Sequence, residues 1–342
     1  SEYDPYSLSD NAIYSFCKDR EDGIWIGSYF GGVNYYPRSY TYFEKYYPKG
    51  IENSLHGKRV REFCRDSQGI LWIGTEDGGL NRFNLKTKDF SFFAPSAGFT
   101  NIHGLCLVDD KLWVGTFSKG LKVIDTRSGV VLKTYQKNDS PRSLIDNSIF
   151  AICKTATGDI YLGTMFGLVR YNKQSDDFDR IPELNGKFIY DIKEDSAGNI
   201  WLATYANGVY CYNVNDRKWK NYVHDDKDNT SLPYNKVSSV FEDSHRQIWL
   251  TTQGGGFCIF HPESETFTSY NSTNGLPSDV VYQIVEDKEG QLWLTTNNGL
   301  VCFQPNTEAM KVYTTANGLL GGQFNYRSSF EDENGMIYFG GI

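Results

Sequence analysis

The sequence predicts an all-β fold, a β-propeller of four-stranded blades, and three observations lead to it. An aromatic anchor flanked by aliphatic residues, usually followed by Gly or Ala and then Thr or Ser, recurs at Trp25, Trp72, Trp113, Tyr161, Trp201, Trp249 and Trp293, with a degenerate copy at Tyr338. The anchors are 40 to 48 residues apart, which is the period of propeller blades, whereas tetratricopeptide and ankyrin repeats are shorter and helical. No segment has a sustained apolar period of about 3.6 residues, so we expect almost no helix.

Each repeat can be divided into four short strands. In the second copy, residues 60–65 form an inner strand, 70–75 the next, 80–84 a third and 90–93 an outer fourth. These segments are rich in β-branched and aromatic residues, and the Asp and Gly residues between them suit turns. The same order of strands is predicted through residues 149–178, 189–222, 237–270 and 280–313.

The number of blades follows from the period. From Trp25 to Tyr338 there are 338 − 25 = 313 residues, or seven periods of about 45. We therefore expect residues 1–342 to form one seven-bladed propeller, and an eight-bladed ring is the alternative. In the seven-bladed ring, the first repeat contributes its third and fourth strands and the last repeat its first and second, which leaves little exposed sheet edge. Residues 1–28 would then be left over from a preceding blade or propeller, and the chain would be a fragment of a longer protein.

Composition and charge exclude several classes of function. The net charge is −8 and there is no basic run, so binding of nucleic acid by this chain is not expected. No stretch approaches the roughly 18 apolar residues that a membrane span needs, so no membrane contact by this chain is expected either. The seven cysteines fall at equivalent strand positions of different blades, too far apart for disulfides, and are predicted to be buried free thiols.

Candidate binding residues lie where the repeats differ. The fold residues agree from blade to blade, whereas the loop between the second and third strands and the position about eleven residues before each anchor vary. Both places should lie on one propeller face. The candidate ligand-binding residues are Tyr29, Phe30, Arg61, Asp77, His103, Phe117, Phe166, Tyr190, Tyr205, Tyr282 and Arg327. Aromatic side chains beside polar ones suit a sugar, although such residues also serve as loop packing or as contacts with another domain.

The sequence predicts no catalytic residues, no metal site and no cofactor. The five histidines lack metal-ligand spacing, and there is no Gly-x-Ser-x-Gly elbow. Glu76 and Asp77 are adjacent acids in a polar loop, and nothing in the sequence places two carboxyl groups across a glycosidase site. The Asp-x-x-Gly segments at Asp66, Asp195 and Asp287 indicate hairpin turns rather than calcium loops.

A motif before each inner strand points to a family. Ser-Leu-x-x-Asn/Asp-x-Ile/Val at residues 7–13, 143–149 and 231–237, followed by Asp-x-x-Gly-x-Ile/Leu-Trp and Gly-Gly-Leu segments, resembles the two-component-regulator propeller repeats. The resemblance implies the periplasmic sensor part of an inner-membrane hybrid two-component protein of Bacteroides-type bacteria. It also implies a second propeller, an immunoglobulin-like domain, a cytoplasmic histidine kinase and a homodimer that rearranges when a glycan product binds. The family's ligand contacts differ between members, so no site residue is transferred.

The sequence thus favours a non-enzymatic sensing module whose partner is an oligosaccharide. Two alternatives from other classes remain open. One is a polysaccharide lyase or hydrolase with a propeller fold, and the other is a purely structural or protein-interaction propeller. Fold alone does not choose among them.

Overall fold

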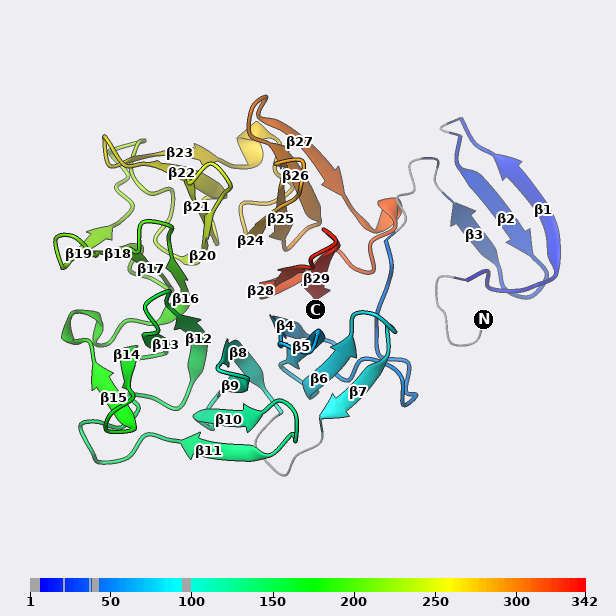
Figure 1. Cartoon of the computed structure of the whole chain (residues 1–342). Coiled ribbons are helices and arrows are strands. Elements are labelled where there is room, and N and C mark those ends of the chain that lie inside the picture. Colours follow the sequence, from blue (N-terminus) through cyan, green and yellow to red (C-terminus); the bar gives the residue numbers. More distant parts are fainter. Residues whose placement is uncertain (1–6, 21, 37, 39–42, 94–99) are drawn as a thin grey trace.

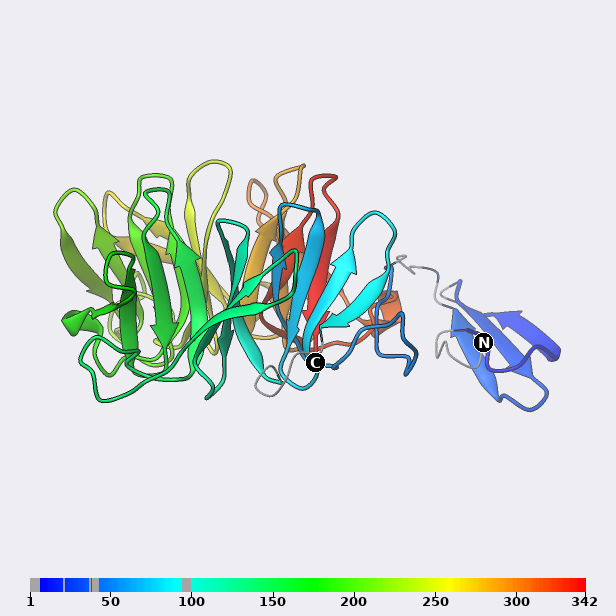
Figure 2. The ribbon, with the colours of Figure 1, turned by 60° about the horizontal axis from the view of Figure 1, so that its bottom comes forward.

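The computed structural model describes residues 7–20, 22–36, 38, 43–93 and 100–342. Most of these residues form a ring of antiparallel sheets, and a small N-terminal sheet lies beside the ring (Figures 1 and 2). The central region that the inner strands surround is called the channel below. Helix is limited, within the described residues, to three 3-10 turns, at Pro182–Leu184, Ser272–Asn274 and Thr315–Asn317. The all-β propeller predicted from the repeat is confirmed.

Six blades of the ring have four strands each. The first three consist of β4 (Val60–Arg65), β5 (Ile70–Thr75), β6 (Gly79–Asn84) and β7 (Phe90–Phe93); β8 (Ile102–Val108), β9 (Lys111–Thr116), β10 (Leu121–Asp125) and β11 (Val131–Tyr135); and β12 (Ile149–Lys154), β13 (Ile160–Thr164), β14 (Gly167–Asn172) and β15 (Asp177–Arg180). The next three consist of β16 (Ile189–Glu194), β17 (Ile200–Thr204), β18 (Val209–Asn213) and β19 (Lys218–Tyr222); β20 (Val237–Glu242), β21 (Ile248–Thr252), β22 (Phe257–His261) and β23 (Thr266–Tyr270); and β24 (Val281–Glu286), β25 (Leu292–Thr296), β26 (Leu300–Gln304) and β27 (Ala309–Tyr313).

The seventh position in the ring is held by two strands, β28 (Phe324–Glu331) and β29 (Ile337–Gly341). The inner strands contact one another in chain order, and β28 contacts β4, which closes the ring. Seven inner strands therefore surround the channel in the described part of the chain. The ring brings the last repeat directly against the first complete blade (Figure 1).

The prediction that the first repeat contributes its third strand to the last blade is wrong. The third strand of the first repeat, β3 (Val33–Tyr36), pairs with β2 (Ile24–Ser28), which pairs with β1 (Ile13–Lys18), and the three form the separate N-terminal sheet. The side chain of Asn34 connects β3 to its own repeat, since it accepts from the backbone N–H of Ser9 and donates to its hydroxyl. Asn81 makes the equivalent bonds to the backbone of His56 inside the first complete blade. The third strand thus stays with its own repeat.

Residues that follow β3 do reach the seventh blade. Phe43 packs into the cluster that contains Phe324, and Tyr46 packs into the cluster that contains Tyr338, although residues 43–46 form no strand. An apolar cavity of about 230 Å³ lies between this segment and β29. The outer half of this blade is therefore covered loosely.

The repeated Asp-x-x-Gly turn has a structural role that explains the anchor. In the first complete blade, one oxygen of the Asp66 carboxylate accepts from two turn N–H groups, and the other accepts from the Trp72 indole at 2.8 Å. The same carboxylate–indole bond joins Asp19 to Trp25, Asp195 to Trp201, Asp243 to Trp249 and Asp287 to Trp293, at 2.7–2.9 Å. These carboxylates are therefore occupied by the turn, as the interpretation of hairpin geometry expects.

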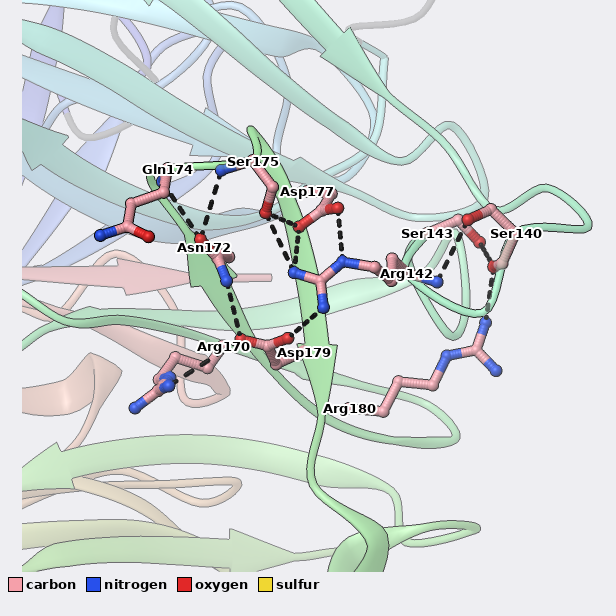
Figure 3. Close-up of polar contacts among 10 residues, drawn as sticks. All are labelled: Ser140, Arg142, Ser143, Arg170, Asn172, Gln174, Ser175, Asp177, Asp179 and Arg180. Atoms are coloured by element: carbon pink, nitrogen blue, oxygen red, sulfur yellow. Dashed lines mark hydrogen bonds and ion pairs between the residues drawn. The ribbon is translucent and has the colours of Figure 1, made fainter.

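The Ser-Leu motif fastens the loop before an inner strand to the blade. Leu55, Leu144 and Leu232 are buried in the core. In the loop before β12, the guanidinium of Arg142 binds Asp177 at 2.6 Å and Asp179 at 2.9 Å, both on β15 (Figure 3). Anchoring of this loop to the outer strand fixes where the inner strand begins, and thus which side chains enter the channel.

All seven cysteines are free thiols, as predicted. The prediction that they are buried holds for Cys211, Cys258 and Cys302, while Cys17 is exposed. The remaining three are half-buried. Cys17 is exposed because β1 belongs to the separate sheet, which lacks the neighbouring blade that covers the equivalent positions in the ring.

Candidate functional site

Each of the six complete blades has a β-bulge near the start of its inner strand. At each bulge, one residue of the inner strand has no partner on the second strand. The bulge changes the direction of the side chain of this unpaired residue. The residues in this position are Arg61, His103, Phe150, Tyr190, Ser238 and Tyr282. Together with Tyr326 of β28 they form one end of the channel, which we call the channel mouth.

The aromatic residues of the channel mouth contact one another across blades. The Phe150 ring lies 4.6 Å from His103 and 6.1 Å from Tyr190. The Tyr326 ring lies 5.1 Å from Tyr190, nearly parallel to it, and 4.9 Å from Tyr282. Four sequence-predicted residues, Arg61, His103, Tyr190 and Tyr282, are thus brought together at one place.

Tyr326 was missed by sequence reasoning, although a signal for it exists. In the first complete blade, 12 residues separate Val60 from Trp72, whereas 14 separate the equivalent Phe324 from Tyr338. The two extra residues make the bulge in β28, between Phe324 and Ser329, larger than in the other inner strands. As a result, both Tyr326 and Arg327 reach partners on other blades.

Arg61 is the most deeply buried cation of the channel mouth. Its side chain is 1% exposed, and its Nε and Nη1 have no hydrogen-bond acceptor within the described residues. The guanidinium lies 4.6 Å from the Tyr326 ring and 5.8 Å from the Phe150 ring, and the nearest carboxylate oxygen, of Glu76, is 3.9 Å from Nε. Burial lowers the pKa of Arg61, and the neighbouring carboxylates oppose that shift. Buried guanidinium nitrogens without acceptors are costly, so the channel mouth is suited to receive an acceptor.

Arg327 has the opposite environment. Its guanidinium donates to Glu62 at 2.7 Å and to Asp191, so that residues of three blades form a buried ion triad. Burial lowers the pKa of Arg327, but the two carboxylates more than offset this, and the pKa lies above its ordinary value. Burial raises the pKa of Glu62 to about 7 in spite of the ion pair. The second oxygen of Asp191 accepts from the backbone of Val240, so Asp191 has partners on two sides. Arg327 is therefore engaged in holding the ring together.

An aromatic surface continues outward from the channel mouth over the second to fourth complete blades. Phe117 lies 5.7 Å from His103, Phe188 lies 4.5 Å from Phe150, and Tyr205 stacks on Phe188 at 5.4 Å. Phe117 and Tyr205 are 40% and 43% exposed. We call Phe117, Phe188 and Tyr205 the aromatic ledge; Phe188 was not among the sequence-predicted residues.

The other sequence-predicted residues lie apart from this arrangement or have other duties. Asp77 accepts from the backbone N–H groups of Lys58 and Arg59 and so stabilises a turn. Phe166 is exposed on the loop between β13 and β14. Tyr29 and Phe30 contact each other at 4.2 Å on the N-terminal sheet, outside the ring (Figure 1).

Several buried polar atoms of the channel mouth have no protein partner within the described residues. These include His103 Nδ1 and Ser238 Oγ as well as the two nitrogens of Arg61. Burial, with a smaller contribution from Arg61, lowers the pKa of His103 to about 2, so its imidazole is neutral at physiological pH. Native proteins rarely leave such atoms unpaired, so a ligand or water is expected to complete them.

The described residues contain no group of three or more His, Cys, Asp or Glu side chains arranged to hold a metal ion. In the same part of the chain, no helix has the length and apolar character needed to span a membrane.

Comparison with known proteins relates the repeats to a described family. A family model described as "Two component regulator propeller" matches residues 7–30, 54–77, 183–206 and 275–298, each of which runs through an anchor. Four segments of the chain thus match the repeat of the two component regulator propeller family.

Particular relatives extend this result. The chain is 30% identical over 258 residues to a protein named histidine kinase P4 of Formosa agariphila, and the match covers 70% of this chain and 18% of the relative. The extracellular domain of a putative hybrid two component system from B. thetaiotaomicron has a TM-score of 0.53 and 24% identity over 96% of this chain and 50% of that chain. Virginiamycin B lyase from Staphylococcus aureus has a TM-score of 0.61 at 14% identity, over 84% of this chain and 94% of that chain. The two structural likenesses concern the fold, and the chain spans half or less of its signalling relatives.

Proposed function

We propose that this propeller is the ligand-sensing module of an extracytoplasmic sensor, periplasmic in location, in a hybrid two-component protein, and that it recognises an oligosaccharide. The family and the relative named as a histidine kinase support a sensor role. The similar extracellular domain supports the location. The parent protein would carry the kinase, while this chain would act by binding alone.

The observation that carries the ligand class is the aromatic ledge beside the channel mouth. Phe117 and Tyr205 are partly exposed to solvent, and sugars bind aromatic faces through their C–H surfaces. Unpaired polar atoms of His103, which lies beside Phe117, and of Arg61, which lies beside Phe150, offer hydrogen bonds for hydroxyl groups. Apolar faces next to convergent polar groups are what a saccharide site requires.

Signal transmission would require partners outside this chain. By resemblance to the family, these are a second propeller, an immunoglobulin-like domain and a second copy of the protein in a homodimer. A ligand can change the dimer only if it binds one arrangement more tightly than the other. The exposed aromatic residues of the N-terminal sheet, such as Phe16 and Phe30, are suited to cover by another propeller of the same protein.

A lyase is the alternative that a specific observation favours, namely the likeness of fold to virginiamycin B lyase. A lyase needs a base that can take a proton near neutral pH. The histidine at the channel mouth, His103, has a pKa lowered to about 2 and is buried, which does not suit a general base acting near neutral pH. Binding without turnover is therefore the better-supported proposal.

The proposal is tested by thermal unfolding of the chain in the presence of a panel of plant and host oligosaccharides, with product analysis of every hit. A ligand that binds only the folded state raises Tm, by about 2.7 kcal/mol of stabilisation at a hundredfold excess over Kd. We expect Phe117→Ala and Tyr205→Ala each to abolish the shift while leaving the Tm of the free protein within a few degrees. Tyr29→Ala is the matched control, because Tyr29 is an exposed aromatic residue outside the ring.

Three outcomes would contradict this proposal. Formation of a cleaved product would make the chain an enzyme. A shift that survives both ledge substitutions but is lost in Tyr29→Ala would move the site to the N-terminal sheet. A panel without any shift would favour the structural or protein-interaction propeller.

A further inference from the structure

We infer that the ligand of the channel mouth is an acidic oligosaccharide, whose carboxylate or sulfate group is held by Arg61. This inference rests on the proposed function and names its substrate class. It also assigns to Arg61 a role that differs from that of the other buried arginine, Arg327.

Arg61 lacks partners that an acidic group would supply. A guanidinium donates hydrogen bonds and accepts none, and two of its nitrogens here have no acceptor within the described residues. A buried charge is tolerated when an opposite charge pairs with it, and Glu76, at 3.9 Å, is too distant to accept a hydrogen bond. A carboxylate or sulfate offers only acceptors and a negative charge, so it supplies both missing partners, whereas a sugar hydroxyl supplies only the acceptor.

The charge of the surrounding face also favours an acidic ligand. This face consists of the three residues before each inner strand and the loops between the second and third strands. Among the described residues, this face carries the cations Lys58, Arg59, Lys119, Lys187 and Lys236, and the anions Glu76, Asp77, Asp146 and Asp279. With Arg61, the balance is six cations to four anions, in a chain whose net charge is −8.

Most of these carboxylates are already occupied. Asp77 accepts from the backbone N–H groups of Lys58 and Arg59, Asp146 from that of Ser148, and Asp279 from that of Ser272. Lys236, by contrast, lies over the Tyr205 ring at 4.4 Å, so a cation stands directly beside the aromatic ledge. The face thus combines ring surfaces for a sugar with cations for its acidic groups.

The geometry also indicates where the acidic group would lie. The Tyr326 ring covers the guanidinium at 4.6 Å and bonds Gln253 through its hydroxyl at 2.9 Å. An acidic group that binds Arg61 would therefore lie against the Tyr326 ring.

The test is calorimetric titration of the chain with three probes: a galacturonic acid trimer, a sulfated galactan oligomer and a neutral galactan oligomer of equal length. The first two distinguish a carboxylate from a sulfate, and the third lacks charge. We expect one acidic probe to bind at least about tenfold more tightly than the neutral one, because a hydrogen bond to a charged group is stronger than a neutral one. Arg61→Gln should remove this preference without lowering Tm.

Arg127→Gln is the matched control, since it makes the same change of charge at an exposed arginine between β10 and β11. Equal binding of acidic and neutral probes, unchanged in Arg61→Gln, would overturn the inference and leave the proposed function standing. The same loss of acidic binding in both variants would also overturn it, because only the net charge would then matter. Binding of none of the three probes would overturn the inference, and the wider saccharide panel decides separately whether the proposed function falls with it.

Discussion

Two arginines are buried in the same channel, and their surroundings are opposite. Arg327 pairs with Glu62 and Asp191 from two other blades, whereas Arg61 has aromatic rings beside it and no carboxylate within hydrogen-bond distance. The guanidinium of Arg327 is thus hydrogen-bonded to carboxylates, whereas that of Arg61 is not. A folded protein tolerates a buried charge without such bonds only where something else compensates for its cost. The comparison separates the part of the channel that maintains the ring from the part available to a ligand.

The largest loss of stability is expected from breaking the ion triad of Arg327, Glu62 and Asp191. Arg327→Met leaves Glu62 and Asp191 buried without their cation, and removing one partner of a buried ion pair costs about 3–5 kcal/mol. Urea unfolding at neutral pH measures the loss. Arg127→Met, at an exposed arginine, should change stability by no more than about 0.5 kcal/mol. A loss of under about 1 kcal/mol for Arg327→Met would mean that the triad does not hold the ring together.

The fold was predictable because its determinants are local. The carboxylate–indole bond from Asp66 to Trp72 spans six residues and recurs in five repeats, so the period of the sequence carries it. The candidate positions Arg61, His103, Tyr190 and Tyr282 were also predictable, because they lie ten or eleven residues before their anchors.

The remaining features depend on contacts that a repeat does not encode. Arg327 and Glu62 are 265 residues apart, and only closure of the ring brings them together. Tyr29 carries the pattern of a binding-face residue, but its repeat lies outside the ring, and the period does not show which sheet a strand will join. Tyr326 reaches the channel mouth through two extra residues in one strand, a departure from the repeat rather than a part of it.

A smaller effect is expected from changing pH around the same triad. The pKa of Glu62 is raised from 4.5 to about 7 by burial, so between these values the folded state binds more protons than the unfolded state. The contribution of Glu62 to stability therefore decreases as pH rises from 4.5 to 7 and stays at the lower level above that. Melting curves from pH 5 to 8 should show that Glu62→Gln becomes more stable relative to the wild type as pH increases. A constant or opposite difference would show that Arg327 keeps the carboxylate ionised throughout.

The smallest effect on stability is expected from substituting Arg61. Arg61→Met removes a buried charge, two of whose nitrogens have no acceptors within the described residues, and keeps an apolar side chain against Phe150 and Tyr326. The desolvation cost disappears with the charge, so the free energy of unfolding should stay within about 1 kcal/mol of the wild type or increase. Urea unfolding under the conditions used for Arg327→Met measures both variants on one scale.

A loss above about 2 kcal/mol for Arg61→Met would place Arg61 with Arg327 among the residues that maintain the fold. In that case, the absence of acceptors around its guanidinium would be compensated by its contacts with the aromatic rings, which contribute about 2 kcal/mol when desolvated. A neutral or stabilising substitution that removes acidic-ligand binding would instead separate binding from stability at a single residue. The two arginines of the channel would then divide these roles between them.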